Sequence, residues 1–398
     1  MKLIYLIWGY SHDTDILQTF QEAGIIADTI VLPSELKQKT EENSSVQQKK
    51  EQRELEEIQY HLLKEQIRTA GGDAVFSINF FSKVSYICQE EGIPYWSWVL
   101  QLPNFDLYTA AIQNICNYFF ICDSYLVEKF WQLGITKTFF LPDAVRADME
   151  RKTVPIEREA CFIARCPKAA LNTEGMSAYG KGYLDAFIHA QRVLYGANIL
   201  ENGLLFRVQK EFMKSIENDP FPENILPKMQ KLFIADQYFA PVCTQVQQHI
   251  FLQNFDSIMT IYSDGDFTDC SSAEKKPFIE EEEKRREIYV RKEFTLVLAP
   301  HVLHNGIPRD LLEVIAAGGF PIAGFQRDYA YFFKRDETLA YFTNPSEFSR
   351  AVVRYGNSIE ERERVKEAAY QMVIKGHTYL HRMIAMLEVW KNHEKEMR

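Results

Sequence analysis

Two histidines, an arginine and a glutamate follow one another closely between two apolar segments, and their side chains suit the binding of phosphate and sugar. His301, His304 and Arg309 supply donors for phosphate oxygens, and either histidine can also act as a titrating acid. Glu313 can accept hydrogen bonds from ribose or sugar hydroxyls. The alternative is that the histidines are ordinary loop residues and that Arg309 is an exposed cation paired with Asp310 or Glu313.

The elements expected around this run are a strand, the start of a helix and a second strand. The apolar residues 294–298 predict the first strand, Pro308 suits a first helical turn, and a Gly-Gly pair ends the helix. Because the helix starts at the carboxyl end of a strand, its first amides and its dipole favour an anion. We therefore expect a phosphate group near the amides of Gly306 and Ile307.

The expected direction of Glu313 follows from the helical repeat. Leu311, Leu312 and Ile315 fall on the face toward the sheet, so Glu313 is expected to point the opposite way, free to meet a ligand. An ordinary helix-and-strand unit explains the same letters, because a Gly-Gly pair after a helix is commonly only its cap. Neither this run nor the turn at Gly9 has the glycine spacing of a dinucleotide fingerprint, which disfavours a nicotinamide-dependent enzyme.

Length and composition limit the class of protein. A chain of 398 residues with 46% hydrophobic content is too long for one ordinary α/β core and fits two domains. The formal net charge of −10 disfavours nucleic-acid binding, which needs clustered basic surface, whereas a small anionic ligand needs only a few local donors. No apolar run reaches the ~18 residues of a membrane span, so no integral membrane segment is expected. Seven cysteines in or beside apolar segments favour reduced thiols and a cytoplasmic location.

Strand-like and helix-like patterns alternate through the first domain, residues 1–150, in the order of a doubly wound parallel sheet. The pattern restarts with an apolar strand at residues 160–164, which predicts a second α/β domain over residues 151–375. One of its helices is expected at residues 183–204. The last helical pattern is expected to split near Gly376, and the C-terminal helix of residues 376–398 is expected to pack back on the first domain.

The first strand of the chain ends in a turn of polar residues. Gly9, Tyr10, Ser11, His12 and Asp13 stand at the edge where doubly wound sheets bind ligands. His12 or Asp13 can serve there as a general base. The alternative is that Ser11 or Asp13 only caps the helix that follows.

Other polar residues of the second domain give weaker signals. Arg165 and Lys168 follow its first strand and can reach the same phosphates, although a solvated loop explains them equally well. Cys161 and Cys166 have no second pair at zinc-finger spacing, and the Asp-Gly-Asp run at 264–266 has the neighbours of a turn. We expect no metal site and no obligatory cofactor.

Several phrases distributed along the chain are informative through their order, from near the first residue to about residue 385. They are Trp8-Gly-Tyr-Ser with Asp15-Ile, Asp73-Ala-Val-Phe-Ser-Ile-Asn-Phe80, Trp96-Ser-Trp-Val, Phe139-Phe-Leu-Pro142, Gly182-Tyr-Leu-Asp-Ala, Gly306-Ile-Pro, Gly318-Gly-Phe and His377-Thr-Tyr-Leu-His-Arg382. In this order they resemble the CgeB-type spore-maturation glycosyltransferases. The resemblance implies a GT-B fold: two Rossmann-like domains that face an interdomain cleft, with the nucleotide-sugar donor held mainly by the second domain and the acceptor by the first.

The chain departs from this pattern at several positions. Similar retaining enzymes place two glutamates, separated by seven residues, around the donor; Glu313 matches the second, whereas Asn305 stands at the first. Relatives show an Asp-Ser-Pro-His type turn where this chain has Gln101-Leu-Pro-Asn104, and arginines where it has its two histidines. These departures imply different substrates or a reduced activity.

The resemblance implies a hexosyltransferase-type enzyme that moves a sugar from a nucleotide-diphosphate-sugar to a glycan, a protein or a cell-surface precursor. The expected donor-binding residues are Arg165, His301, His304, Asn305, Gly306, Ile307, Arg309 and Glu313; the acceptor-side residues are Gly9, Tyr10, Ser11, Gln101 and Asn104; and the catalytic residues are His12, Asp13 and Glu313. The departures leave a second hypothesis open, a non-catalytic glycosyltransferase-like subunit that binds a nucleotide or a partner.

Overall fold

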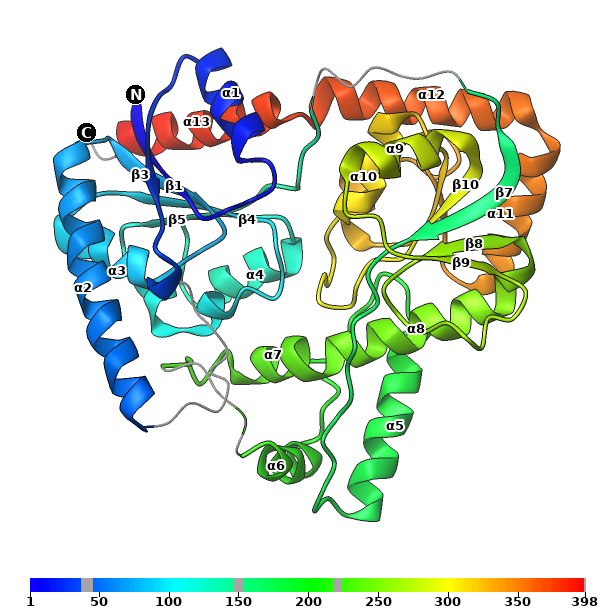
Figure 1. Ribbon diagram of the computed structural model, residues 1–398, viewed down its shortest axis with the longest axis horizontal. Coiled ribbons are helices and arrows are strands. Elements are labelled where there is room, and N and C mark those ends of the chain that lie inside the picture. Colours follow the sequence, from blue (N-terminus) through cyan, green and yellow to red (C-terminus); the bar gives the residue numbers. More distant parts are fainter. Residues whose placement is uncertain (37–45, 147–153, 218, 220–223, 397–398) are drawn as a thin grey trace. The chain divides into compact units, whose positions relative to one another are not determined.

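The computed structural model describes residues 1–36, 46–146, 154–217, 219 and 224–396 (Figure 1). The chain forms two compact units. Unit 1 comprises Met1–Pro142, Asn218–Phe233 and Tyr379–Arg398, and unit 2 comprises Asp143–Glu217 and Ile234–Thr378. The domain boundary expected at residues 150–151 lies outside the described residues.

Unit 1 contains a six-stranded parallel sheet in the order β2-β1-β3-β4-β5-β6. Its strands are β1 (Lys2–Ile7), β2 (Ile26–Val31), β3 (Ala74–Ile78), β4 (Tyr95–Val99), β5 (Asn117–Ile121) and β6 (Thr138–Phe140). Its helices are α1 (Asp13–Glu22), α2 (Val46–Ala70), α3 (Ser82–Glu91), α4 (Ser124–Gln132) and α13 (Tyr379–Glu396). The strand order reverses between β1 and β3, so the carboxyl ends of these two strands mark the ligand-binding edge of a doubly wound sheet.

The last helix joins unit 1 through aromatic packing and one buried hydrogen bond. The ring of Trp390 lies 5.4 Å from that of Trp96, and Arg382 Nε donates to the carbonyl of Pro142 at 2.8 Å. Two residues separate the end of helix α12 (Ile359–Gly376) from the start of α13, which confirms the expected split near Gly376.

Unit 2 contains a second six-stranded parallel sheet in the order β12-β11-β10-β7-β8-β9. Its strands are β7 (Glu157–Ile163), β8 (Met259–Tyr262), β9 (Glu274–Lys276), β10 (Lys292–Val297), β11 (Pro321–Gly324) and β12 (Ala340–Phe342). Besides α12, its helices are α5 (Ala178–Arg192), α6 (Phe206–Ser215), α8 (Ala240–Phe255), α9 (Glu282–Arg291), α10 (Arg309–Ala317) and α11 (Pro345–Asn357). Helix α7 (Gln230–Ile234) belongs to unit 1 except for its last residue. Two parallel sheets confirm the expected α/β, doubly wound architecture.

Helices cover both faces of the sheet of unit 2. One apolar cluster joins the sheet to α9, α10 and α12, and another joins it to α8 and α11 (Figure 1). Helix α10 therefore has the sheet on one side and other helices on the opposite side. This arrangement decides the environment of Glu313, described below.

The helix expected at residues 183–204 is wrong at both ends. Helix α5 begins at Ala178 and ends at Arg192, and the residues up to Leu205 form a loop. Within this loop Gly196 has a φ of +68°, a conformation that costs a glycine little and other residues more. A side chain is also excluded there, because an added Cβ would lie 2.4 Å from the ring of Phe325. The loop therefore packs directly against the end of β11.

Candidate functional site

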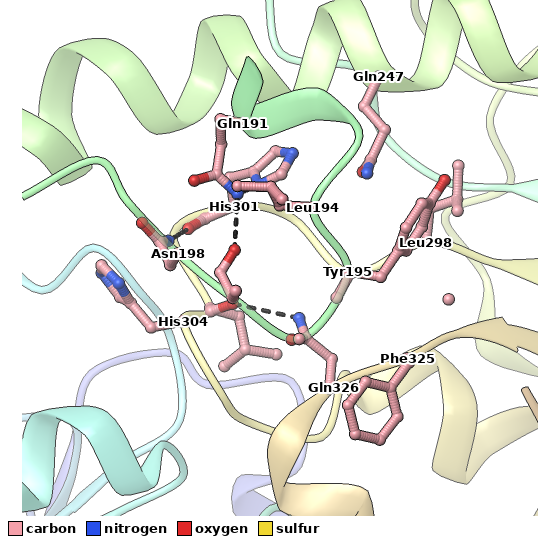
Figure 2. A pocket seen from close by; sticks show the side chains of 15 residues that line it. Gln191, Leu194, Tyr195, Asn198, Gln247, Leu298, His301, His304, Phe325 and Gln326 are labelled. Atoms are coloured by element: carbon pink, nitrogen blue, oxygen red, sulfur yellow. Dashed lines mark hydrogen bonds between the residues drawn. The ribbon is translucent and has the colours of Figure 1, made fainter. Parts of the chain in front are cut away.

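The edge of unit 2 that suits a ligand lies at the carboxyl ends of β7 and β10, where the strand order reverses. The neighbouring ends of β10 and β11 border a small pocket that is partly open to solvent; Figure 2 shows the side chains that line it. The loop after α5 and one side chain of α8 complete its wall. The lining residues are Gln191, Leu194, Tyr195, Gly196, Ala197, Asn198, Gln247, Leu298, Ala299, His301, Leu303, His304, Gly324, Phe325 and Gln326.

The hydrogen bonds of Gln191 decide which nitrogen of His301 carries a proton. The backbone N–H of Ile199 donates to Gln191 Oε1 at 2.7 Å, so this atom is the amide oxygen. The amide nitrogen, Nε2, donates to Ala197 O at 3.0 Å and lies 3.4 Å from His301 Nδ1. His301 Nδ1 is therefore the acceptor, and Nε2 of the neutral ring carries the hydrogen.

His301 is a neutral hydrogen-bond donor at physiological pH. Burial, and the nearby His304, lower the pKa of His301 to about 4. The expectation that His301 acts as a titrating acid is therefore wrong near neutral pH, because burial disfavours the imidazolium. Its Nε2 is buried and has no hydrogen-bond partner among the described residues, a state that costs about 1–3 kcal/mol. A ligand atom in the pocket would offset that cost.

The residues between His301 and α10 form a buried polar loop. His301 N donates to Thr244 Oγ1 at 2.8 Å, and His304 Nε2 lies 2.7 Å from the carboxylate of Asp236. The carbonyl of Asn305 accepts from the backbone of Asp328 at 3.0 Å. Gly306 and Ile307 follow directly and are buried at the start of α10. The structure thus brings the five expected loop residues to one edge of the sheet.

Glu313 lies at the centre of a buried ion network. Arg309 Nε donates to its carboxylate at 2.8 Å, and Arg285 Nη2 donates at 3.1 Å from helix α9. Only 2% of the surface of Glu313 is exposed, so the expectation that it points outward, free to meet a ligand, is wrong. The helical repeat placed it away from the sheet, but α9 covers that side of α10.

Arg309 connects this network to the first residue of unit 2. Its Nη1 lies 3.2 Å from the Asp143 carboxylate, and a quarter of its side chain (25%) is exposed. Its pairing with Glu313, weighed as the alternative interpretation, is confirmed. Because Arg309 is partly exposed at the start of α10, it can still contribute charge to an anion at that helix terminus.

The arginines and the burial of the network shift two carboxyl pKa values in opposite directions. Burial alone would raise the pKa of Glu313, but Arg309 and Arg285 outweigh it and lower that pKa. Burial and the neighbouring Glu313 raise the pKa of Asp310 to about 7. The start of α10 therefore holds one carboxyl group whose pKa is lowered beside another whose pKa is raised.

Arg165 follows β7 but forms ion pairs at the surface. It lies 3.1 Å from the Asp264 carboxylate and 2.6 Å from that of Glu280, with 57% of its side chain exposed. Exposed ion pairs of this kind contribute little free energy, so a phosphate can compete for the arginine. Asp264 also accepts from the backbone of Cys166 at 2.9 Å, which fits the turn expected at 264–266.

In unit 1 the turn after β1 is ordered around His12. Gly9 has a φ of +94°, which lets the chain turn at the end of β1. Tyr10 is buried, Ser11 is exposed, and the His12 ring lies 5.5 Å from that of Tyr10. His12 Nδ1 lies 2.9 Å from Asp15 Oδ2, an orientation typical of a histidine base.

The side chain of Asp13 is oriented differently from that of His12. Its carboxylate accepts from the phenol of Tyr5 inside the unit, and burial raises the pKa of Asp13. This bond directs Asp13 toward β1, which disfavours it as the base. Neither Ser11 nor Asp13 is the N-cap of α1; that residue is His12, which makes no side-chain capping bond.

Gln101 and Asn104 follow β4 on the same edge of the sheet of unit 1. Asn79, at the end of β3, donates to Gln101 Oε1 at 3.1 Å and accepts from the backbone amides of Leu100 and Gln101 at 3.0 Å. Asn104 precedes a short 3₁₀ turn without a side-chain cap. The expected acceptor-side residues thus stand at the ends of β1 and β4, with Asn79 between them in the strand order.

No group of three or more His, Cys, Asp or Glu side chains in the described ranges is arranged to hold a metal ion. Among the helices of those ranges, none combines the length and the apolar character needed to cross a bilayer.

Several residues of the candidate site were not identified from the sequence. Arg285 and Asp143 meet the α10 network from distant positions, and no spacing signals such pairs. The uncharged amides of the pocket were also missed, because glutamine and asparagine are common surface residues in loops and helices. They are Gln191, Asn198, Gln247 and Gln326.

Comparisons with known proteins agree with this fold. Residues 260–388 match a family model described as "Glycosyl transferase-like". The structure of the T4 phage BGT in complex with its UDP-glucose substrate is similar over 98% of this chain and 99% of that chain, with 8% identity and a TM-score of 0.50. A sucrose-phosphate synthase from Thermosynechococcus elongatus (8% identity, 100% of each chain, TM-score 0.49) and a glycosyltransferase from Rickettsia africae (10%, 98% of each chain, 0.47) also match. No curated protein matches the sequence.

The fold is therefore that of the GT-B glycosyltransferases. The part of the chain that matches the glycosyl transferase-like family contains β10, α10 and β11, and with them most of the pocket lining.

Proposed function

We propose that the protein is a glycosyltransferase that binds a nucleotide-diphosphate-sugar at the carboxyl edge of the sheet of unit 2. The observation that carries this proposal is the meeting of two features in the glycosyl transferase-like segment. One is a helix start with Arg309 at its first position, and the other is the adjoining pocket with an unsatisfied buried donor on His301. Together they suit a ligand with one anionic and one uncharged part.

The start of α10 is the proposed binding site of the diphosphate. The amides of Gly306 and Ile307 and the helix dipole favour an anion, and Arg309 adds a guanidinium. Sugar transfer requires stabilisation of the departing diphosphate, and loss of one such donor typically costs about 2.7–4 kcal/mol of barrier. Glu313 acts by holding Arg309 and Arg285, so its proposed role is to position the arginines.

On the acceptor side we propose His12 as the general base. Asp15 orients its ring, and an oriented imidazole can take the proton of an acceptor hydroxyl. The acceptor is proposed to be a glycan, a protein or a cell-surface precursor, as the resemblance to the CgeB-type enzymes implies. Gly9, Tyr10, Ser11, Gln101 and Asn104 are proposed to contact it.

The experiment is a melting-temperature panel with UDP, GDP, ADP and their sugars, followed by an assay for nucleotide released from the sugar that stabilises most. At about a hundred times its Kd, the preferred ligand should add about 2.7 kcal/mol to the free energy of unfolding. Release of free nucleotide would establish turnover. A protein that no nucleotide stabilises at millimolar concentration contradicts the proposal, and tight binding without turnover indicates a non-catalytic subunit.

A further inference from the structure

The pocket of Figure 2 is lined almost entirely by uncharged groups; the exception is the ring of His304, which is paired with the buried carboxylate of Asp236. None of its fifteen lining residues carries a carboxylate, an ammonium or a guanidinium group. Burial keeps His301 neutral, as its lowered pKa indicates. A phosphate or a carboxylate placed in such a pocket would lose its hydration, and the one opposite charge in the lining, that of His304, is already paired with Asp236, so burial of the anion is unfavourable.

The polar atoms of the lining include two amide oxygens that can accept, one imidazole N–H that can donate, and the hydroxyl of Tyr195, which can do either. Gln247 Nε2 donates to Arg192 O at 3.2 Å, and Gln326 Nε2 donates to Leu303 O at 3.2 Å. These bonds fix both amides, and neither Oε1 accepts a hydrogen bond from a described residue. His301 Nε2–H is the donor without a partner.

Hydroxyl groups are complementary to this array, because each hydroxyl both donates and accepts. A ligand with several hydroxyls can donate to the two amide oxygens and accept from His301. A phosphate ester or a carboxylate has no hydrogen to donate, so it would face the amide oxygens unfavourably.

Two aromatic residues shape the rest of the wall. An added Cβ at Gly324 would lie 3.0 Å from the ring of Tyr195, and one at Gly196 would lie 2.4 Å from the ring of Phe325. Each ring thus packs on bare backbone, which gives the pocket an apolar side next to its polar side. Sugars present the same combination of C–H faces and hydroxyl edges.

We propose that this pocket receives the transferred sugar, that this sugar is uncharged, and that Gln247, Gln326 and His301 determine its selection. The inference rests on the proposed function and adds the class of sugar and the residues that recognise it. The diphosphate then lies outside the pocket, toward Arg309.

The test compares ligands that share one nucleotide, the nucleotide being the one that the melting-temperature panel selects. The affinities of the nucleoside, the nucleoside diphosphate, its glucose derivative and its glucuronic acid derivative are measured by calorimetry. Gln247→Leu keeps the size of the side chain and removes its acceptor. Gln248→Leu, on the same helix and equally buried but outside the lining, is the matched control.

We expect Gln247→Leu to lower the affinity for the glucose derivative about fivefold, which is the effect of one ordinary hydrogen bond. The affinity for the nucleoside diphosphate should stay within about twofold. The control variant should change neither. We also expect the wild-type protein to bind the glucuronic acid derivative more weakly than the glucose derivative. Gln247→Lys, which adds a cation to the wall, should reverse that preference at least in part.

Three outcomes would overturn the inference. An equal loss for the diphosphate and its glucose derivative would show that the pocket does not hold the sugar. An equal loss for the nucleoside alone would assign the pocket to the base. Equal affinity of the wild-type protein for the two sugars would show that the transferred group need not be uncharged. If no nucleotide binds the wild-type protein at all, the proposed function itself fails, and the inference fails with it.

Discussion

The start of α10 and the adjoining pocket lie on the same edge of one sheet, yet they differ in whether their polar groups have partners. At α10 the charged groups of Arg309, Glu313 and Arg285 are bound to one another. In the pocket all groups but the ring of His304, which is paired with Asp236, are uncharged, and His301 Nε2 has no partner among the described residues. A charged residue of a motif can thus be paired with its neighbours, whereas an uncharged residue can keep a polar atom that only a ligand would satisfy.

Removal of one charge from the α10 network should have the largest effect. Glu313→Gln leaves Arg285 and Arg309 without their shared carboxylate, and breaking a buried ion pair in this way typically costs about 3–5 kcal/mol. Urea unfolding measures the change. Glu283→Gln is the control, because the Glu283 side chain is exposed and is paired with Arg286. A loss at Glu313 no larger than at Glu283 would show that the network is not structural.

The neutral state of the buried His301 should be measurable as a pH dependence of the free energy of unfolding. His301 has a folded pKa of about 4, against about 6.5 when unfolded, so between these values only the unfolded state takes up its proton. The free energy of unfolding should therefore fall as the pH drops from about 6.5 to about 4, by on the order of 3 kcal/mol from this residue alone. His301→Asn should flatten the profile in that window. An unchanged profile would contradict the assignment of a buried neutral His301.

Arg309→Ala should affect the part of the ligand that binds at α10 and not the part that binds elsewhere. The guanidinium acts on phosphate charge, so the variant should weaken the binding of a nucleoside diphosphate by about 1.5–3 kcal/mol and leave the binding of the nucleoside unchanged. Calorimetry on the folded variant measures both affinities, and their ratio does not depend on the stability lost from the network. Equal losses for the two ligands would place Arg309 away from the diphosphate.

The smallest expected effect concerns the backbone of the pocket wall. Gly196→Ala places a Cβ in the left-handed region, at a cost of about 1–2 kcal/mol, and forces the Phe325 ring to move. Gly175→Ala has a similar φ of +74° but no neighbour within 4 Å, so it controls for backbone strain alone. A sugar derivative should bind more weakly to the first variant only. Identical binding by both variants would show that Phe325 does not shape the site.

The sequence predicts the fold better than the site, for physical reasons. Apolar alternation and turn residues are local, so most strands of both sheets and the helix at Arg309 follow from short segments, whereas the short strands β9 and β12 were not predicted. The environment of Glu313 is not local, because it depends on Arg285 of a separate helix. The role of Gln247 is equally invisible in the sequence, since only the fold brings α8 beside the ends of β10 and β11.

The expectation for His12 and Asp13 shows the same limit in unit 1. Adjacent residues in a turn look equivalent in the sequence, yet one is bound to Tyr5 and the other to Asp15. Which of the two side chains binds the phenol of Tyr5 depends on how the turn folds back on β1. Spacing alone could not decide it.

Hydrogen–deuterium exchange with and without a saturating nucleotide-sugar tests the central claim most directly. The ligand is the one that stabilises the protein most in the melting-temperature panel. We predict slower exchange in residues 298–309 at the end of β10 and in residues 194–198 of the pocket loop, with the nucleoside diphosphate alone protecting only the first segment. Binding that leaves residues 298–309 unprotected would contradict the assignment of the donor site to this edge of unit 2.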